Sequence, residues 1–321
     1  MSKAQRLDER EIGTKTRDLY PTRGTQEYLT ERIDPVVYGD GEPKGEHSLT
    51  QEQLDIYEQN GFIVVPDVFS RAEVDTFIGE YRKLAASDKL QDREELVMEP
   101  ASNRPRSIFS LHRFSELFAR LSRDRRILDK IVQILDSDVY IHHTRINIKR
   151  PLNGKSFPWH SDFETWHAED GIPRCRILSA WIMLTENNQF NGPLFLIPGS
   201  HKYFVSCSGF TPENNHKYSL RKQEYGVPSM KTLEKLTAEG GMAAALGSPG
   251  TLILHEGNVM HGSADNISPV PRTNLFFVYN SVRNVPAEKP FAAPKFRPEF
   301  LASRDYSPLQ PIEGEYDHSG D

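Results

Sequence analysis

Two histidines and an aspartate have the residue types and the spacing of a metal site. His160 and Asp162 are separated by one residue, and His261 follows about 100 residues later. Side chains at positions i and i+2 of a β-strand point to the same face, so one strand end could direct His160 and Asp162 to one point. Two imidazoles and one carboxylate on one face of an ion form the facial triad of non-haem Fe(II) oxygenases, which leaves positions open for a cosubstrate and O2. The sequence therefore predicts an Fe(II) site at His160, Asp162 and His261.

A cation follows the second histidine at a position suited to a carboxylate ligand. Arg272 lies eleven residues after His261, and its planar guanidinium can bind a carboxylate with two parallel hydrogen bonds. In a jelly roll we expect His261 to end one strand and Arg272 to begin the next, so that both face one cavity. An oxygenase that uses 2-oxoglutarate needs such a cation for the distal carboxylate of this cosubstrate, and Lys149 is a second candidate.

Two other classes of protein fit a His/His/Asp set. Three ligands and a water molecule can hold Zn2+ for hydrolysis, and a jelly-roll protein can bind a ligand without catalysis. A hydrolase needs no carboxylate-binding cation beside its metal, so Arg272 and Ser263 favour the oxygenase. The intact triad argues against a protein that only binds.

The elements that must position these residues are mostly short strands. Helices are predicted behind capping boxes at Thr50 and Ser70 and, from apolar spacing, over residues 114–135. The predicted strands are separated by Gly, Pro and Asn: residues 138–149, 177–184, 194–197, 250–255 and 274–280. Many short strands with turn signals predict a mostly β protein with flanking helices, folded as a sandwich or barrel.

The predicted strand 138–149 has one unusually polar face. Alternation places six residues on this face: Val139, Ile141, His143, Arg145, Asn147 and Lys149. Such a face is too polar for an ordinary core. It therefore predicts either a solvent-exposed strand or a polar pocket.

Composition along the chain predicts three segments. Residues 1–46 are polar and predict an extended arm, residues 47–283 form the predicted dioxygenase domain, and residues 284–321 form a Pro-rich C-terminal strap. A long polar insertion at residues 211–241, with a short helix expected at Met230–Leu236, predicts a lid over the site.

The overall composition excludes several classes of partner. The 321 residues are 37% hydrophobic and 26% charged, which is typical of a globular protein with a core. A net charge of -6 argues against nucleic acid as a partner. The sequence has no apolar run of about 20 residues for a membrane span and no secretory signal at its start. With Cys175 and Cys207 expected to be free buried thiols, we expect a cytoplasmic protein.

Residues 159–171 resemble the signature of ectoine hydroxylases, which are Fe(II)- and 2-oxoglutarate-dependent enzymes of the phytanoyl-CoA dioxygenase superfamily. The stretch reads Trp159-His160-Ser161-Asp162-Phe163-Glu164-Thr165-Trp166-His167, followed by Glu169-Asp170-Gly171. The resemblance covers most of the chain and includes four further stretches: Asp34–Tyr38, Thr211–Asn214, Lys222–Pro228 and Phe276–Asn280.

The resemblance implies a double-stranded β-helix fold, or jelly roll, and roles for particular residues. Iron is expected at the triad, and 2-oxoglutarate near five residues: Lys149, Phe157, Asn147, Ser263 and Arg272. The implied substrate is a small zwitterionic cyclic amino acid. Trp166 and Phe276 would hold its cation, and Arg145 would meet its carboxylate. A homodimer is also a possibility that the family implies.

Two positions in the predicted substrate pocket depart from ectoine hydroxylases. His143 stands where they usually have Gln, and His255 stands where they have Phe. Residues 297–305 also resemble the tail of free L-proline hydroxylases of the same superfamily. Conversion of ectoine to 5-hydroxyectoine is therefore the leading expectation, with L-proline or a related amino acid as the alternative. Protonation of the two imidazoles would make activity depend on pH.

Overall fold

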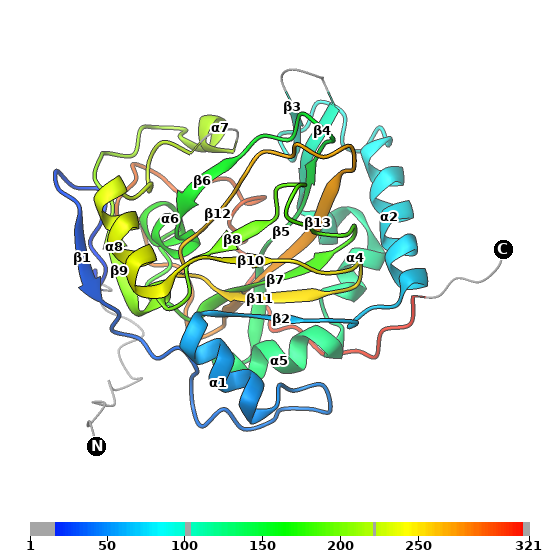
Figure 1. Cartoon of the computed structure of the whole chain (residues 1–321), viewed down its shortest axis with the longest axis horizontal. Helices are drawn as coiled ribbons and strands as arrows, with labels where there is room; N and C mark the ends of the chain where they lie inside the picture. The colour runs from blue at the N-terminus through cyan, green and yellow to red at the C-terminus, as the bar shows by residue number, and fades with distance from the viewer. Residues whose placement is uncertain (1–16, 100–103, 221–222, 317–321) are drawn as a thin grey trace.

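A computed structural model describes residues 17–99, 104–220 and 223–316 (Figure 1). The predicted arm, lid and strap each include residues outside these ranges, at 1–16, 221–222 and 317–321. A seven-stranded antiparallel sheet has the order β2-β11-β7-β13-β5-β4-β3, and a four-stranded antiparallel sheet has the order β10-β8-β12-β6. A third, two-stranded sheet pairs β1 with β9.

The strands and helices alternate irregularly along the chain. The strands are β1 (Tyr28–Glu31), β2 (Phe62–Val65), β3 (Leu96–Glu99), β4 (Arg104–Phe109), β5 (Val139–Lys149), β6 (Phe157–His160), β7 (Ile177–Met183), β8 (Leu194–Leu196), β9 (Tyr203–Ser206), β10 (Ala243–Ala245), β11 (Leu252–Glu256), β12 (His261–Ser263) and β13 (Arg272–Ser281). The helices are α1 (Gln51–Asn60), α2 (Arg71–Ala85), α3 (Leu111–Phe114), α4 (Glu116–Leu121), α5 (Arg125–Leu135), α6 (Asp162–Asp170), α7 (His216–Ser219) and α8 (Met230–Gly240), with a 3-10 turn at Ser200–Lys202.

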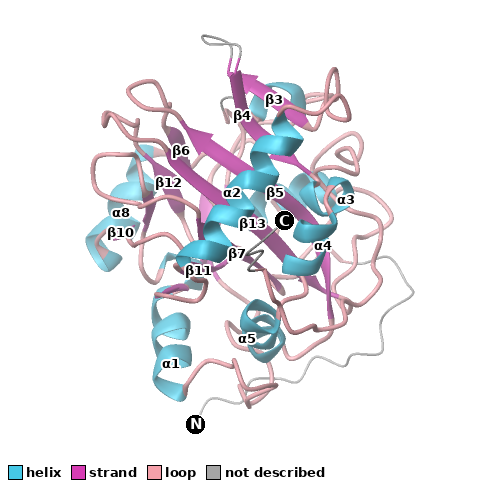
Figure 2. Cartoon of the chain, turned by 90° about the vertical axis from the view of Figure 1, so that its right-hand side faces the viewer, coloured by secondary structure: helices cyan, strands magenta, loops and turns pink. Residues whose placement is uncertain are grey.

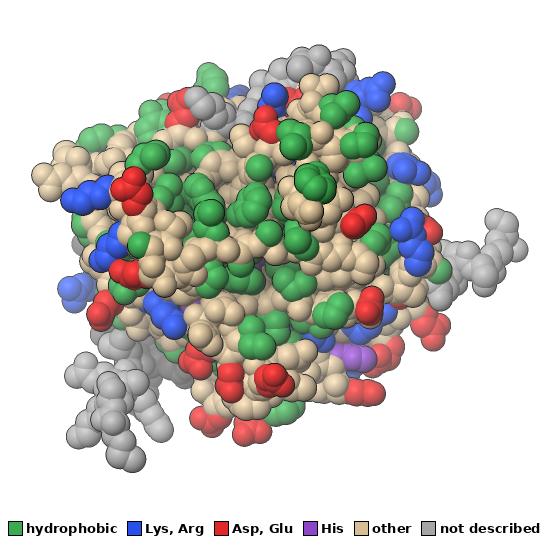
Figure 3. All heavy atoms as spheres, viewed as in Figure 1, with side chains coloured by type: hydrophobic (Ala, Val, Ile, Leu, Met, Phe, Trp, Pro, Cys, Tyr) green, Lys and Arg blue, Asp and Glu red, His purple; other side chains and the backbone are tan. Residues whose placement is uncertain are grey.

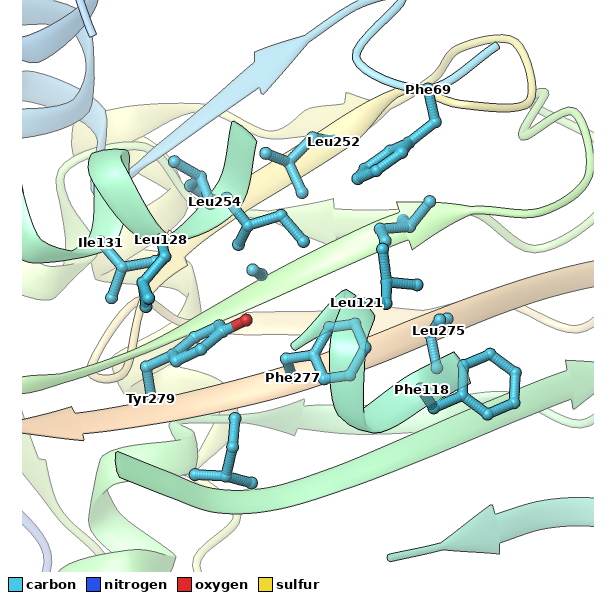
Figure 4. Close-up of a cluster of buried hydrophobic side chains, with 14 of the residues drawn as sticks. Phe69, Phe118, Leu121, Leu128, Ile131, Leu252, Leu254, Leu275, Phe277 and Tyr279 are labelled. Atoms are coloured by element: carbon cyan, nitrogen blue, oxygen red, sulfur yellow. The ribbon is translucent and has the colours of Figure 1, made fainter. Parts of the chain in front are cut away.

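Helices cover the outer face of the seven-stranded sheet. Figure 2 shows α2 crossing this face, with α4 and α5 beside it. Apolar side chains of these helices pack on alternate residues of the central strands, as Figure 4 shows for Phe118, Ile131, Leu254 and Phe277. Each fully buried side chain of this size stabilises the fold by roughly 1.5–3 kcal/mol. This core fixes the sheet whose other face carries the candidate site.

Local capping explains where the helices begin. Thr50 and Ser70 form complete capping boxes with Gln53 and Glu73, as predicted. The prediction of a single helix over residues 114–135 is wrong. Helix α3 ends at the first residue of this range, and α4 and α5 occupy the rest of it as two separate helices. Ser115 caps α4 and a carboxylate oxygen of Asp124 caps α5. Each side chain accepts a hydrogen bond from a backbone N–H in the first turn, so a new helix begins at each of these residues.

The two larger sheets pack face to face. Trp181, Ile253 and Phe276 from the seven-stranded sheet contact Leu194 and Leu196 from the four-stranded sheet. Two antiparallel sheets enclosing a core agree with the predicted jelly roll. The apolar packing fills one part of the space between them, and the rest forms a polar-lined cavity.

A β-bulge in β5 corrects the predicted strand face. Tyr279 of β13 lies opposite Ile141, but the next residue, Val278, lies opposite His143, so His142 is an extra residue in β5. The inserted residue reverses the alternation. Ile141 therefore packs in the outer core with Val139, whereas His142 and His143 both contact the ring of Trp166. The prediction that Val139 and Ile141 share the polar face is wrong.

The surface segments are more ordered than their composition indicates. Residues 17–46 lie on the domain, with β1 paired to β9 and Tyr20 buried. Helix α8 extends to Gly240, four residues past the predicted end.

Cys175 and Cys207 are free and buried, as predicted. On the face shown in Figure 3, positive and negative side chains are interspersed. None of the described helices is long and apolar enough to cross a membrane.

Candidate active site

The three predicted metal ligands come from three elements that meet between the sheets. His160 ends β6, Asp162 begins α6 and His261 begins β12, directly opposite His160. The prediction that His160 and Asp162 share a strand face is wrong, because Ser161 leaves the strand and caps α6 through the backbone N–H of Glu164. His261 likewise begins a strand instead of ending one.

The ligand atoms of this triad converge on one point. One ligand atom from each of the three residues lies within 4.8 Å of the others. The carboxylate of Asp162 is 3.5 Å from Nε2 of His160 and 3.8 Å from Nε2 of His261. The Nδ1 atoms of the two histidines lie 2.9 and 3.0 Å from the carbonyl oxygens of Pro158 and Val259, respectively. If each Nδ1–H donates to its carbonyl, both Nε2 lone pairs face the common point.

Burial sets the protonation of the triad. Burial, with the nearby His160, lowers the pKa of His261 to about 3, so its imidazole is neutral at pH 7. Burial alone would raise the pKa of Asp162, but the neighbouring His261 and His160 outweigh it and hold the pKa well below its usual range. A carboxylate beside a neutral imidazole suits a divalent metal ion, which binds deprotonated donor atoms.

Arg272 lines the cavity and has one side-chain nitrogen without a partner. Its side chain is fully buried, and Nε and Nη2 donate to the carbonyl of Gly192 at 3.1 and 2.9 Å. Gly192 has φ +69°, and a Cβ there would lie 2.5 Å from the carbonyl oxygen of Ala264, so this turn needs glycine. Burial and Arg145 lower the pKa of Arg272 to about 9, which still leaves it charged at pH 7. The buried Nη1 has no partner, which fits an incoming carboxylate.

The other four predicted cosubstrate residues differ in their placement. Asn147, Phe157 and Ser263 line the cavity with Arg272. Lys149 does not, because its Nζ turns to the carbonyl of Ala264. Burial and the neighbouring Arg272 lower the pKa of Lys149 to about 6, so it carries little charge at neutral pH.

The predicted substrate side of the cavity is aromatic and cationic. Trp166, Phe276 and Arg145 line it, and the Arg145 guanidinium lies 4.8 Å from the centre of the Phe276 ring. Trp181, which the sequence did not single out, stacks on Phe276 with ring centres 3.8 Å apart. Burial lowers the pKa of Arg145 to about 10, and its Nε is buried without a partner. This wall could bind a small ligand that carries both a carboxylate and a delocalised cation.

The two unusual histidines have different surroundings. His143 lines the cavity. His255 is not part of the lining, because it lies behind His261, with ring centres 4.9 Å apart, and against Trp181. Burial lowers the pKa of His143 and of His255, so both are neutral at physiological pH. A lowered pKa argues against a protonation change near neutral pH, and the hypothesis that these two imidazoles make activity depend on pH stays a prediction.

Several lining residues come from two segments in which the sequence analysis named no individual site residue. The C-terminal strap contributes Arg297, whose guanidinium pairs with Asp170, and Leu301. The insertion at 211–241 contributes a wall segment with five lining residues: Asn215, Ser219, Leu220, Gln223 and Tyr225. The excess of polar residues in the strap and the insertion was the only sequence signal that these residues line the cavity.

Comparison of the sequence with known proteins identifies a family. The family model described as "Phytanoyl-CoA dioxygenase (PhyH)" matches residues 57–274. The chain belongs to the phytanoyl-CoA dioxygenase family. Within this family, it is 44% identical over 297 residues to the ectoine dioxygenase of Streptomyces coelicolor, covering 92% of this chain and 98% of that protein.

Two solved structures match this chain over most of its length. The crystal structure of EctD from S. alaskensis with 2-oxoglutarate and 5-hydroxyectoine has a TM-score of 0.83 and 41% sequence identity, and the match covers 93% of this chain and 99% of that chain. The same enzyme with bound Fe has a TM-score of 0.82 and 40% identity, with the same coverage. The predicted fold, the resemblance to ectoine hydroxylases and the enzyme class, a 2-oxoglutarate-dependent dioxygenase, are confirmed.

Proposed function

We propose that this protein hydroxylates ectoine to 5-hydroxyectoine with Fe(II), 2-oxoglutarate and O2. The observation that carries the proposal is the match over 93% of the chain to an enzyme whose structure holds 2-oxoglutarate and 5-hydroxyectoine. The cavity between the sheets has the groups that this reaction needs: a His/His/Asp set, a buried guanidinium and an aromatic wall.

The metal would bind to His160, Asp162 and His261. Three ligands of these types would leave positions on the ion open for cosubstrate and O2. Iron at this site would activate O2, with 2-oxoglutarate as the source of two electrons. The protein's own part is to hold the ligands, orient the two organic molecules and exclude water.

The cosubstrate fits the end of the cavity at Arg272. The free Nη1 of Arg272 would bind the distal carboxylate of 2-oxoglutarate with a charge-assisted hydrogen bond. On the same strand, both polar side-chain atoms of Asn274 are buried without a partner. A buried polar group without a hydrogen-bond partner costs stability. The unpaired atoms of Arg272 and Asn274 therefore fit a ligand with several carboxylate oxygens. Asn147, Phe157 and Ser263 complete this end of the cavity.

The substrate would lie between the metal and the aromatic wall. Arg145 would bind the carboxylate of ectoine, and the faces of Trp166 and Phe276 would bind its delocalised cation. We also propose that the described residues 211–220 and 223–225 of the predicted lid form the cover of the site. In this stretch, Asn215 donates to Glu169 at 2.9 Å and Gln223 donates to Thr165 at 3.3 Å, which ties the cover to helix α6.

A substrate panel tests the proposal. Purified protein with Fe(II), ascorbate and 2-oxoglutarate is given ectoine, L-proline or pipecolate, and succinate release is followed. We expect ectoine to give the fastest coupled turnover. Turnover with L-proline but not with ectoine would contradict the proposed substrate, while leaving the enzyme class intact.

A further inference from the structure

Residues 17–34 of the N-terminal arm place two buried arginines against the metal-ligand segments. Arg23 is 3% exposed, and the side chain of Arg32 is also 3% exposed. A buried guanidinium is stable only when partners satisfy its charge and its N–H groups. The partners of these two arginines lie on different elements, and each element carries or precedes a predicted metal ligand.

Arg23 binds the helix that Asp162 begins. Its Nε and Nη2 donate to the two carboxylate oxygens of Glu164 at 2.7 and 2.8 Å, a bidentate pair that fixes both position and angle. Its Nη1 donates to Glu169 at 3.2 Å. Glu164 lies in the first turn of α6, two residues after Asp162, and it is fully buried. The arm therefore holds the first turn of α6 from outside the cavity.

Arg32 acts on the turn that leads to His261. Its Nη1 forms an ion pair with Glu256 Oε1 at 2.9 Å. The other oxygen of Glu256 accepts from the backbone N–H of Asn258 at 2.6 Å. Asn258 in turn accepts a hydrogen bond from Ser161 at 3.0 Å.

This chain of contacts connects the segment that carries His160 and Asp162 to the turn before His261. Ser161 is the residue between His160 and Asp162, and Asn258 lies three residues before His261. The backbone N–H of Phe163 also donates to the carbonyl of Gly257 at 2.8 Å. The turn at 256–258 and the start of α6 are thus bonded directly to each other, and the arm holds each of them with one buried arginine.

We infer that Arg23 and Arg32 are positioning residues for the metal site: they hold the segment of Asp162 and the turn before His261 at the separation that a bound metal requires. The inference rests on the proposed function only in taking the triad as a metal site. Groups that orient metal ligands from behind commonly change metal affinity by about 10- to 100-fold when they are replaced.

The test is a Co(II) titration of the full chain, followed by the visible absorption of the bound ion. We expect Arg23→Gln and Arg32→Gln to weaken Co(II) binding at least tenfold. The matched control is Arg126→Gln, because Arg126 also forms partly buried ion pairs, with Glu73 and Asp124 at 2.8 Å, on the outer face of the large sheet. The control is expected to lower the melting temperature and to keep the wild-type Co(II) affinity. Wild-type affinity in both arm variants, or an equal loss in the control, would overturn the inference.

A double variant shows whether Arg32 acts through Glu256. In Arg32→Gln the Glu256 carboxylate stays buried without its cation, whereas Arg32→Gln with Glu256→Gln removes that charge and keeps an acceptor for the Asn258 N–H. We expect the double variant to bind Co(II) more tightly than the single variant, and no recovery would contradict the route through Glu256. Should Arg23→Gln fail to fold, Arg23→Lys keeps the charge but cannot bind both oxygens of Glu164, and it is expected to weaken Co(II) binding as well.

The same titration separates this inference from the proposed function. A wild-type protein that binds no Co(II) at the triad would contradict the metal site itself. A wild-type protein that binds Co(II) and hydroxylates ectoine, with arm variants that bind equally well, would contradict only the role of the arm.

Discussion

Replacement of Arg272 by Gln removes a buried cation from the lining of the cavity. The guanidinium uses two N–H groups on Gly192 and has Nη1 free for a ligand. A hydrogen bond to a charged group contributes about 1.5–3 kcal/mol. Since 1.4 kcal/mol is a factor of ten, Arg272→Gln should raise the KM for 2-oxoglutarate by roughly 10- to 150-fold.

Initial rates of succinate formation at a series of 2-oxoglutarate concentrations measure this effect. We expect kcat at saturating cosubstrate to change much less than KM, because the lost contact is made equally in the bound state and in the reaction. Lys149→Gln is the matched control, since Lys149 turns to Ala264 and is outside the lining. An unchanged KM in Arg272→Gln, or a larger change in Lys149→Gln, would refute the assignment of Arg272.

Three further changes test other parts of the site and fold. Asp162→Ala should abolish both Co(II) binding and turnover, and full activity in this variant would contradict the ligand assignment. Arg145→Gln should raise the KM for ectoine by roughly 10- to 150-fold and leave the KM for 2-oxoglutarate within a few-fold, as measured by the same kinetics. Burial lowers the pKa of His201 to about 3 from an unfolded value near 6.5. The unfolded chain therefore binds the extra proton between these values, and stability falls as pH drops from about 6.5 to 3, by at most about 1.4 kcal/mol per pH unit from this group. Urea unfolding of His201→Gln should show a shallower loss over this window, and an unchanged slope would contradict this role of His201.

Regular patterns in the sequence predicted the scaffold well. The capping boxes at Thr50 and Ser70 begin α1 and α2 because both partners of each box lie within four residues. Strands β5, β7, β8, β11 and β13 could be located from β-branched and aromatic runs between turn residues, whereas the short strands β9 and β10 were not predicted. The chemistry of His160, Asp162 and His261 could be predicted because few residue types bind Fe(II), and the structure brings these three together.

Features that depend on contacts between distant segments could not be predicted. The bulge at His142 cannot be recognised from the sequence pattern of β5, because it is defined by the pairing register against β13. Trp181 lies in a strand that is apolar on both faces, so its place in the cavity is not visible from periodicity. The partner of Lys149 is a backbone carbonyl more than 100 residues away, and sequence does not specify such contacts. A homodimer and a cytoplasmic location stay predictions.

The most direct test of the central claim is the identity of the product formed from ectoine under 18O2. Full-length protein with Fe(II) and 2-oxoglutarate is incubated with ectoine, and the product is examined by mass spectrometry and NMR. The account predicts 5-hydroxyectoine that carries one labelled oxygen atom, formed together with succinate and absent without 2-oxoglutarate. Unchanged ectoine, in a preparation that binds metal at the triad and oxidises another small amino acid, would contradict it.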